Sequence, residues 1–583
     1  MTCKRKRSET DLASRSTASK RSRHTESHDL LSPLSDELLI RILTFLPLPD
    51  LLNTAPVSRR FYDLSGDSQI WKHLYYSRFV LPRALRIPGF RDGSTREGKL
   101  HYSSRKAIWV DGRRGGWVDM HVGDLDDRSR NWKQQYKLRH NWSKGKCAVE
   151  ELSLGKEGSL SETSPSYKML VKVSEGVAVT ADVATGLRAW NLKTKQLLAQ
   201  ITLGETESDV APSCMAVDDQ RLGDQILEIA IGFTDGSFGV WRLGIREAGI
   251  LRRYRHEKSS NGELVGIAFC YPYLLTATKS VLLSLYTFDI PPKTNRPITP
   301  ESDVESVLDS KNERIRNQKD WPIFKDPKPR KQDNTNHISL RSPYLLTSLK
   351  SHTSKAPLAL SIRKMAGGIV ASIAYTFSTM RGWCVGIQDL HIHSPTPESK
   401  SAPDITATRL AYTRPIRTPY ISSSFNNLDP LSEFRGDNMD GPISLSYTHP
   451  YLLVTLPDNT LILYLCTSNA TSLSISSGTR LFGHTSGISD AEITARGKAV
   501  SVSRYGEEIR VWELEGRAHG ESIEVRPTMK PSLSEGGPET FAHNYLGAVL
   551  RDDSRNWVGF DDEMVIVLKG LQGRESLMVY DFT

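Results

Sequence analysis

The first part of the chain, residues 30–79, carries apolar side chains at helical spacing. Ser35 stands where a helix would be capped, and two acidic residues follow in the first turn, where the helix dipole favours negative charge. One apolar stripe then consists of Leu38, Leu39, Ile42, Leu43, Phe45 and Leu46. Pro47, Pro49 and Pro56 interrupt this pattern, which therefore predicts three or four short helices. So small a helical segment buries little surface, and its surplus apolar side chains are expected to meet a partner.

Beyond residue 165 the pattern changes to β structure. Short runs of Val, Ile, Leu, Thr and Tyr alternate with Gly, Asp and Asn turns, which predicts many small antiparallel strands. The unit Pro-Tyr-Leu-Leu recurs at 272–275, 343–346 and 450–453. A turn followed by a strand that ends in an aromatic residue recurs at 235–241 and 458–464, and most clearly in 483–513. Sheets with two apolar faces stack radially until a ring closes, so these repeats predict a β-propeller.

The repeats predict about seven blades, and six to eight remain open because the fourth could be two. The expected bounds are 166–203, 211–256, 262–290, 337–395, 441–480, 481–517 and 540–582. Residues 291–336 and 396–440 are polar and aperiodic, and they are expected to be insertions between blades. The last strand, 576–582, is expected to pair with the first blade and close the ring.

Composition narrows the class of protein. The chain has 583 residues, of which 38% are hydrophobic and 25% charged, so more than one folded unit is expected. It has no apolar run of eighteen residues and no signal-peptide pattern, which argues against a membrane span and against secretion. Its six cysteines lie far apart without a CxxC pair, which fits a reducing compartment. No cofactor or metal is expected, because His391 and His393 alone make an incomplete metal site.

The net charge of +9 is unevenly distributed. The first thirty residues hold eight Lys or Arg against four Asp or Glu, and they lack apolar periodicity. Residues 1–29 are therefore predicted to be a disordered basic tail. Its clusters at 4–7 and 20–23 resemble a bipartite nuclear import signal, so the nucleus, the cytoplasm or both are expected. Nucleic acid is not the expected ligand, because the folded body lacks an overall basic surface.

The helical segment resembles an F-box. Ser35 replaces the usual proline of that motif, and Ser58 replaces the usual cysteine. The matching residues are Leu34 through Leu39, Leu46, Asp50 through Leu52, Val57 through Phe61, Ile70 and Trp71. A second stretch is similar to the linker of F-box/WD-repeat proteins, and it contains Trp132, Lys133, Tyr136, Arg139, Asn141, Trp142 and Gly145. The expected order is an F-box at 30–79, a linker at 80–165, and a propeller of WD-like blades at 166–583.

This resemblance implies the substrate receptor of a Skp–cullin–F-box (SCF) ubiquitin ligase, a subunit without catalytic residues. The F-box would bind a Skp-type adaptor, which would connect the protein to a cullin. The propeller would bind a protein target. By carry-over, the residues that contact the adaptor would be Leu34, Leu38, Ile42, Leu46, Leu51, Val57 and Trp71. One alternative is that some of them fill the small helical core. Another is a scaffold in the nucleus or cytoplasm that recruits no cullin.

The resemblance also assigns residues in the propeller. His484, Trp512 and Trp241 would be structural residues of WD repeats. Arg504 occupies the place of an arginine that reads phosphate in some relatives, since a guanidinium meets phosphate bidentately. Tyr505 replaces the usual turn aspartate, and the other arginines of that cluster are missing. Whether the target must be phosphorylated therefore stays open. The chain has no GxxxxGK, HExxH or GxSxG motif, which argues against an enzyme.

Overall fold

The computed structural model describes two compact units of the chain. It covers residues 30–84, 100–102, 107–109, 114–115, 131–153, 169–204, 210–289, 339–393, 403–416, 441–514, 522–527 and 556–583, except 32, 352, 366–367, 470, 496 and 572–573. Unit 1 comprises Met1–Tyr76 with Asn131–Lys133, and unit 2 comprises Ser77–Arg130 with Gln134–Thr583. The predicted tail at 1–29 and the predicted insertion at 291–336 lie outside the described residues.

Unit 1 is the predicted bundle of short helices. Its helices are α1 (Asp36–Leu43), α2 (Leu48–Thr54), α3 (Arg59–Ser65) and α4 (Ser68–Tyr75), with a 3₁₀ turn at Ala55–Val57. Ser58 caps α3, since its hydroxyl accepts a hydrogen bond from the Phe61 amide at 3.2 Å, and Asp67 caps α4 in the same way. Ser35 precedes α1 with an extended backbone, but its side chain makes no cap bond.

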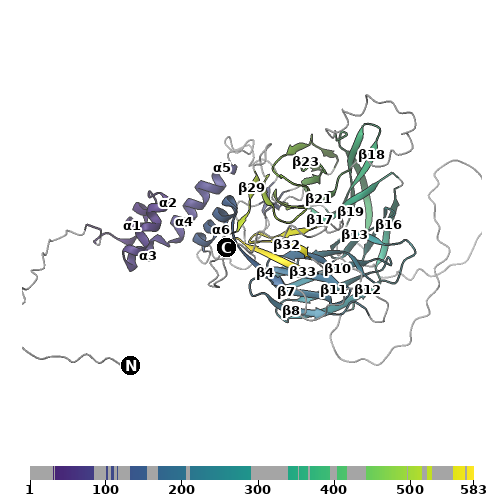
Figure 1. The fold of residues 1–583 in the computed structure, drawn as a ribbon, viewed down its shortest axis with the longest axis horizontal. Coiled ribbons are helices and arrows are strands. Elements are labelled where there is room, and N and C mark those ends of the chain that lie inside the picture. Colours follow the sequence, from purple (N-terminus) through teal and green to yellow (C-terminus); the bar gives the residue numbers. More distant parts are fainter. Residues whose placement is uncertain are drawn as a thin grey trace, which may run out of the picture. The chain divides into compact units, whose positions relative to one another are not determined.

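Among the described residues of unit 2, seven sheets follow one another along the chain, and their strands pair antiparallel except for one parallel pair in the seventh (Figure 1). The first two are β5 (Leu170–Ser174), β6 (Val177–Asp182), β7 (Gly186–Asn191) and β8 (Gln196–Ile201), then β9 (Pro212–Asp218), β10 (Ile226–Phe233), β11 (Phe238–Gly244) and β12 (Gly249–Arg255). The third and fourth are β13 (Leu264–Cys270), β14 (Tyr273–Thr278), β15 (Leu282–Thr287) and β16 (Tyr344–Lys350), then β17 (Lys355–Met365), β18 (Gly368–Thr379), β19 (Gly382–His393) and β20 (Asp404–Tyr412).

The remaining three sheets complete the series. The fifth has β21 (Ser444–Thr448), β22 (Tyr451–Thr455), β23 (Leu461–Ser468), β24 (Leu473–Ile475) and β25 (Thr479–Leu481). The sixth has β26 (Ile488–Ile493), β27 (Lys498–Ser503), β28 (Ile509–Glu513) and β29 (Ser522–Glu524). The seventh is ordered β30 (Arg526–Pro527), β4 (Lys146–Ser153), β33 (Arg574–Asp581), β32 (Met564–Leu571) and β31 (Trp557–Phe560). A separate small sheet holds β1 (Leu100–Tyr102), β2 (Ala107–Trp109) and β3 (Arg114–Gly115).

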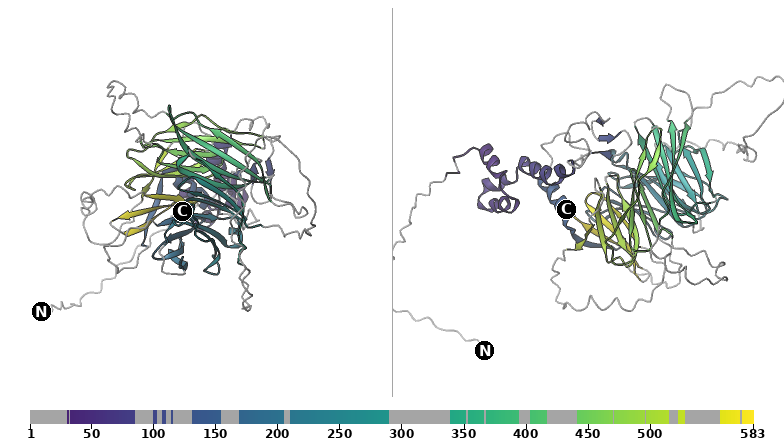
Figure 2. Two further views of the ribbon diagram at one scale, coloured as in Figure 1. Left: turned by 90° about the vertical axis from the view of Figure 1, so that its right-hand side faces the viewer. Right: turned by 90° about the horizontal axis from the view of Figure 1, so that it is seen from above.

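The first strands of the seven sheets form a closed ring. Each of β5, β9, β13, β17, β21, β26 and β31 contacts the next, and β31 contacts β5. Figure 2 shows the same order, because the colours run around the domain from blue through teal and green to yellow. The structure is therefore a seven-bladed β-propeller, as the repeats predicted.

Two expected blade bounds were wrong. The second Pro-Tyr-Leu-Leu unit, at 343–346, was assigned to the fourth blade, but it begins β16, the outer strand of the third blade. Tyr344 of that unit is exposed, whereas Tyr273 of the first unit is buried. Likewise β20 lies inside the expected insertion at 396–440 and is the outer strand of the fourth blade. Outer strands bury only one face, so both lack the apolar run that marks an inner strand.

Closure of the ring also differs from the expectation. The last strand, β33, pairs with β4 rather than with the first blade, and Leu577 lies opposite Leu152 (Figure 1). Strand β4 was assigned to the linker, yet it is an outer strand of the seventh sheet. Its mixture of charged and apolar residues fits that half-buried place, since Cys147 and Leu152 are buried whereas Lys146 and Glu151 are exposed. The propeller is thus closed by pairing a strand from before the first blade with the C-terminal strand.

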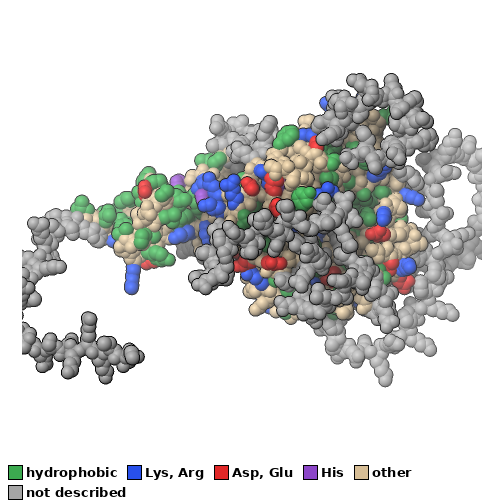
Figure 3. Space-filling view, in the orientation of Figure 1, with side chains coloured by type: hydrophobic (Ala, Val, Ile, Leu, Met, Phe, Trp, Pro, Cys, Tyr) green, Lys and Arg blue, Asp and Glu red, His purple; other side chains and the backbone are tan. Residues whose placement is uncertain are grey.

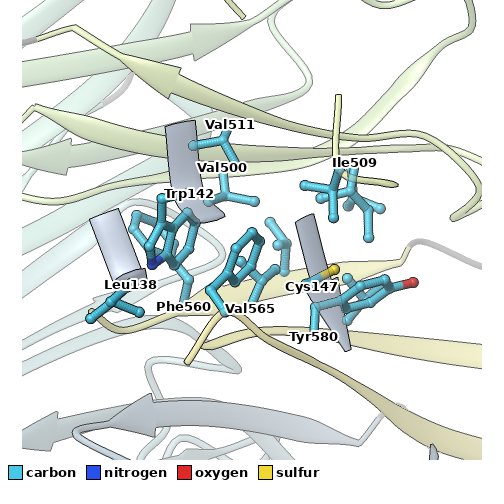
Figure 4. Close-up of a cluster of buried hydrophobic side chains, with 14 residues drawn as sticks. Leu138, Trp142, Cys147, Val500, Ile509, Val511, Phe560, Val565 and Tyr580 are labelled. Atoms are coloured by element: carbon cyan, nitrogen blue, oxygen red, sulfur yellow. The ribbon is translucent and has the colours of Figure 1, made fainter. Parts of the chain in front are cut away.

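Helix α6 (Trp132–Lys144) packs on the propeller through its second half. Trp142 stacks on Phe582 with ring centroids 3.8 Å apart, and its indole N–H donates to the Asp562 carbonyl at 2.9 Å. The Asn141 amide donates to the Phe582 carbonyl at 2.8 Å. Figure 4 shows Trp142 and Leu138 beside Val500 and Phe560 in one buried cluster. Trp142 and Asn141 of the linker motif therefore fix α6 to the last two blades.

We expect deletion of Leu577–Thr583 to lower the thermal midpoint by about 10 °C or more, because buried Leu577, Val579 and Phe582 leave the core and β4 loses its partner. Differential scanning calorimetry measures this. As a matched pair, Leu577→Ala should cost about 2–5 kcal/mol of unfolding free energy, and Leu197→Ala, at an exposed position of β8, less than about 0.5 kcal/mol. An unchanged midpoint after the deletion would contradict closure through β33.

Candidate partner-binding site

Helix α1 presents apolar side chains to solvent. Leu38 and Ile42 are 52% and 47% exposed, and their spacing of four residues puts them on one side of the helix. Phe45, just beyond the last residue of the helix, is 78% exposed. We call these three residues the exposed apolar face. Leu30, Leu31, Leu52, Val57 and Tyr62 are further exposed apolar residues of unit 1. Figure 3 shows hydrophobic side chains gathered over this unit. A surface that faces only water would be expected to carry polar groups there instead.

The other side of the same helix forms the core of unit 1. Leu39 and Leu43 of α1 are buried, and so are Leu51, Ile70 and Trp71. The Trp71 indole N–H donates to the Ser65 carbonyl at 2.7 Å, which satisfies its polar atom inside the core. An ion pair of Arg60 with Asp36, at 2.7 Å, and a hydrogen bond from Arg60 to the Leu34 carbonyl hold α3 against the start of α1.

The structure divides the seven residues assigned to adaptor contact. Leu38, Ile42 and Val57 are exposed, Leu34 and Leu46 are half-buried, and Leu51 and Trp71 are core residues. Leu51 and Trp71, at 0% and 3% exposure, fit the alternative that some of the seven fill the helical core, because packing of α2 and α4 turns both inward. Exposed Phe45 was not among the seven residues taken from the resemblance, although it belongs to the same apolar stripe as Leu38 and Ile42. Its position after the last turn of α1 is the signal that could have revealed its exposure.

The predicted structural residues of the sixth blade form one hydrogen-bonded chain. Trp512 donates its indole N–H to the Ser501 hydroxyl at 2.9 Å, and that hydroxyl lies 2.6 Å from Nε2 of buried His484. The His484 Nδ1 atom lies 3.4 Å from Glu508 Oε2. Since Ser501 accepts from Trp512, its own proton is free to point at Nε2, which leaves the imidazole proton on Nδ1 facing the carboxylate.

Tyr505 stands where the resemblance expects a turn aspartate, and Glu508 supplies a carboxylate in its place. It accepts hydrogen bonds from the Thr485 amide and hydroxyl at 3.0 Å and from Arg510 Nε. Burial alone would raise the pKa of Glu508, but the bonds from Thr485 and Arg510 outweigh it and lower this pKa to about 2. Burial lowers the pKa of His484, so the imidazole stays neutral. A carboxylate in the turn just before the Trp512 strand was the sequence signal that could have found Glu508.

Trp241 and Arg504 take different places. Trp241 is fully buried in the second blade beside Phe233, with ring centroids 6.3 Å apart. Arg504 has an exposed side chain, although its backbone is fixed by bonds to Gly487 and Asn556. Two further polar residues of the propeller, Asp182 and Ser489, make contacts within the fold. Asp182 pairs with Arg188 at 3.2 Å, and buried Ser489 donates to the Asn556 carbonyl.

No metal or membrane feature emerges from the part of the chain that the structure describes. There, no group of three or more His, Cys, Asp or Glu side chains is placed to hold a metal ion. His391 contacts the Arg409 guanidinium instead, and burial followed by the Arg409 charge lowers the pKa of His391. Among the described residues, no helix is long and apolar enough to span a membrane.

Comparison with family models decides the family. Residues 147–583 match the family described as the F-box protein pof12 beta-propeller. The chain belongs to this family. Residues 36–77 match the F-box-like family, which places that match on helices α1 to α4. This pof12-type protein therefore joins an F-box-like domain to a seven-bladed propeller, an architecture consistent with an F-box substrate receptor.

Two solved structures are similar to the chain at low sequence identity. A structure of U3-55K is 10% identical, covers 74% of this chain and 98% of its own, and has a TM-score of 0.39. The C-terminal WD40 domain of Sif2 is 11% identical, covers 75% of this chain and 84% of its own, and has a TM-score of 0.34. No curated protein matches the chain in sequence.

For the Glu508 network we expect a pH-dependent contribution to stability. The folded pKa of about 2 lies below the ordinary 4.5, so the stabilisation is complete above about pH 4.5 and is lost as the pH falls toward 2. Glu508→Gln should thus reduce the free energy of unfolding more at pH 7 than at pH 3, as measured by urea titration. The control is Glu507→Gln, at the exposed neighbouring position. Equal losses for Glu508→Gln at both pH values would contradict this assignment.

Proposed function

We propose that this pof12-type protein is the substrate-recognition subunit of an SCF ubiquitin ligase. The observation that carries the proposal is the exposed apolar face, Leu38, Ile42 and Phe45, on an F-box-like domain that precedes a propeller. F-box domains generally bind Skp-type adaptors. In this proposal the adaptor covers the exposed apolar face and connects the protein to a cullin.

The energetics of α1 support a docking role. Complete burial of a leucine, isoleucine or phenylalanine side chain contributes about 1.5–3 kcal/mol, so three such residues are enough for an interface centre. Neighbouring residues of the same helix hold it in place, because Leu39 and Leu43 fill the core. The face is thus presented on a preorganised helix, which lowers the entropic cost of association.

The propeller would bind the target protein and position it for ubiquitination and proteasomal degradation. A rigid ring that presents loops at its two ends suits this purpose, because loops can vary while the blades stay in place. The protein itself makes and breaks no bond in this scheme. If the adaptor binds without a cullin, the protein would be a scaffold of a nuclear or cytoplasmic complex.

The test is an affinity pull-down from cells, read by mass spectrometry. Leu38→Ala/Ile42→Ala/Phe45→Ala should lower recovery of adaptor and cullin by about tenfold or more, since each truncation removes apolar contact area. The matched control is Leu197→Ala/Leu465→Ala/Phe482→Ala, which changes similar exposed side chains on the propeller and should retain both partners. Trp71 is unsuitable for this purpose, because its loss would open the core.

The outcomes separate the candidate functions. Adaptor and cullin retained by the control but lost from the α1 variant support the ligase subunit, and proteins retained by the α1 variant become target candidates. Adaptor without cullin supports the scaffold. Recovery of neither partner by the unchanged protein would refute the assignment of the F-box-like domain to adaptor binding.

We also propose that the basic tail directs the protein to the nucleus through its clusters at 4–7 and 20–23. These residues lie outside the described part of the structure. Replacing the Lys and Arg of both clusters by Ala should shift a fluorescent fusion from nucleus to cytoplasm, as seen by microscopy. The control replaces exposed Lys258 and Lys350 of the propeller. An unchanged nuclear fraction after the tail substitutions would exclude an import role for the clusters.

A further inference from the structure

A second surface, on helix α6, is distinguished by charge rather than by apolar area. From Arg128 to Val149 the sequence has seven Lys or Arg and no Asp or Glu, so this short stretch carries seven of the nine net positive charges of the chain. Figure 3 shows Lys and Arg side chains gathered over α6. A further net charge of +4 lies in residues 1–30, so the other residues together carry −2, and the positive potential of this stretch is local within the folded body.

The structure places several of these groups on one side of α6. Tyr136, His140 and Lys144 follow one another at intervals of four residues, which aligns them along the helix. Arg78 lies in a separate π-helical turn, Tyr76–Val80. It extends this row, because its guanidinium donates to the Tyr136 hydroxyl at 2.6 Å. The rings of Tyr136 and His140 are parallel to within 10°. We call Arg78, Lys137, His140, Lys144 and Lys146 the basic stripe.

Three other members of the basic stripe act on the protonation of His140. The pKa of His140 is lowered by burial and, after that, by the positive charges of Arg78, Lys144 and Lys146. Lys137, Lys144 and Lys146 are exposed, and no ion pair is recorded for them among the described residues. Like charges at such a distance repel one another, and an anionic partner would relieve that repulsion.

We propose that the basic stripe binds an acidic segment of a partner protein. The 13 residues of α6 span about 20 Å, the length of about six residues of extended peptide. Lysine ammonium groups on flexible stems suit irregularly spaced carboxylates. A nucleic-acid surface would be expected to extend a basic track over more of the body, which the near-neutral remainder of the chain lacks.

The interaction is tested with the full chain and a fluorescent polyglutamate peptide of about eight residues. In fluorescence anisotropy at low salt, Lys137→Gln/Lys144→Gln/Lys146→Gln should weaken binding by about tenfold, since three of the charges that attract the peptide are lost. The matched control, Lys258→Gln/Lys350→Gln/Lys364→Gln, makes the same change in net charge at exposed lysines of the propeller and should alter affinity less than about twofold. Circular dichroism confirms that both variants fold.

Two results would overturn this inference. Equal weakening by the two triple variants would show that net charge rather than the basic stripe attracts the peptide. Tighter binding of a single-stranded oligonucleotide of the same charge, lost in the Lys137/Lys144/Lys146 variant, would assign the stripe to nucleic acid instead. A stripe-dependent preference for polyglutamate over the oligonucleotide supports the proposal.

Discussion

Each blade of this propeller has an apolar face on both sides, and a neighbouring blade must cover each of them. The buried cluster of Leu152, Met169 and Leu577 shows what this requires at the junction of the seventh and first blades. Leu152 comes from β4, Met169 precedes the first blade, and Leu577 lies in β33. Pairing of β4 with β33 therefore joins the two ends of the array, next to the contact of β31 with β5 that closes the inner ring of strands.

Carboxylate–arginine pairs tie strands together within most blades. Asp182 pairs with Arg188 in the first blade and Asp389 with Arg363 in the fourth, both with little exposure. Further pairs are Glu228 with Arg242 and Arg253, Asp458 with Arg480, and Glu508 with Arg510. Buried ion pairs cost desolvation and add little net stability, but breaking one leaves a charge stranded. Such pairs fix the register of blades whose WD-repeat residues have diverged.

In the helical unit, apolar side chains are divided between the core and the surface. Leu38 and Leu39 are neighbours in sequence, yet one faces solvent and the other fills the core. A bundle of four short helices has too little interior for every apolar residue of its stripes. The leftover side chains are on a helix whose inward face is fully packed, and this makes α1 a rigid platform rather than a loosely folded segment. The exposed apolar face is on α1, and the basic stripe is a separate surface on α6.

The structural roles of His484, Trp512 and Trp241 came from the resemblance to WD repeats. Local pattern was sufficient to predict the short helices and a propeller of about seven blades, with six to eight left open, because helical spacing and repeated turns are properties of neighbouring residues. It could not assign β4, β16 or β20 to their blades, since an outer strand buries one face only and its partner lies far away in the chain. Nor could it show that Leu38 is exposed while Leu51 is buried, or that Glu508 supplies the carboxylate missing at Tyr505. Burial and hydrogen-bond partners depend on which segments pack together.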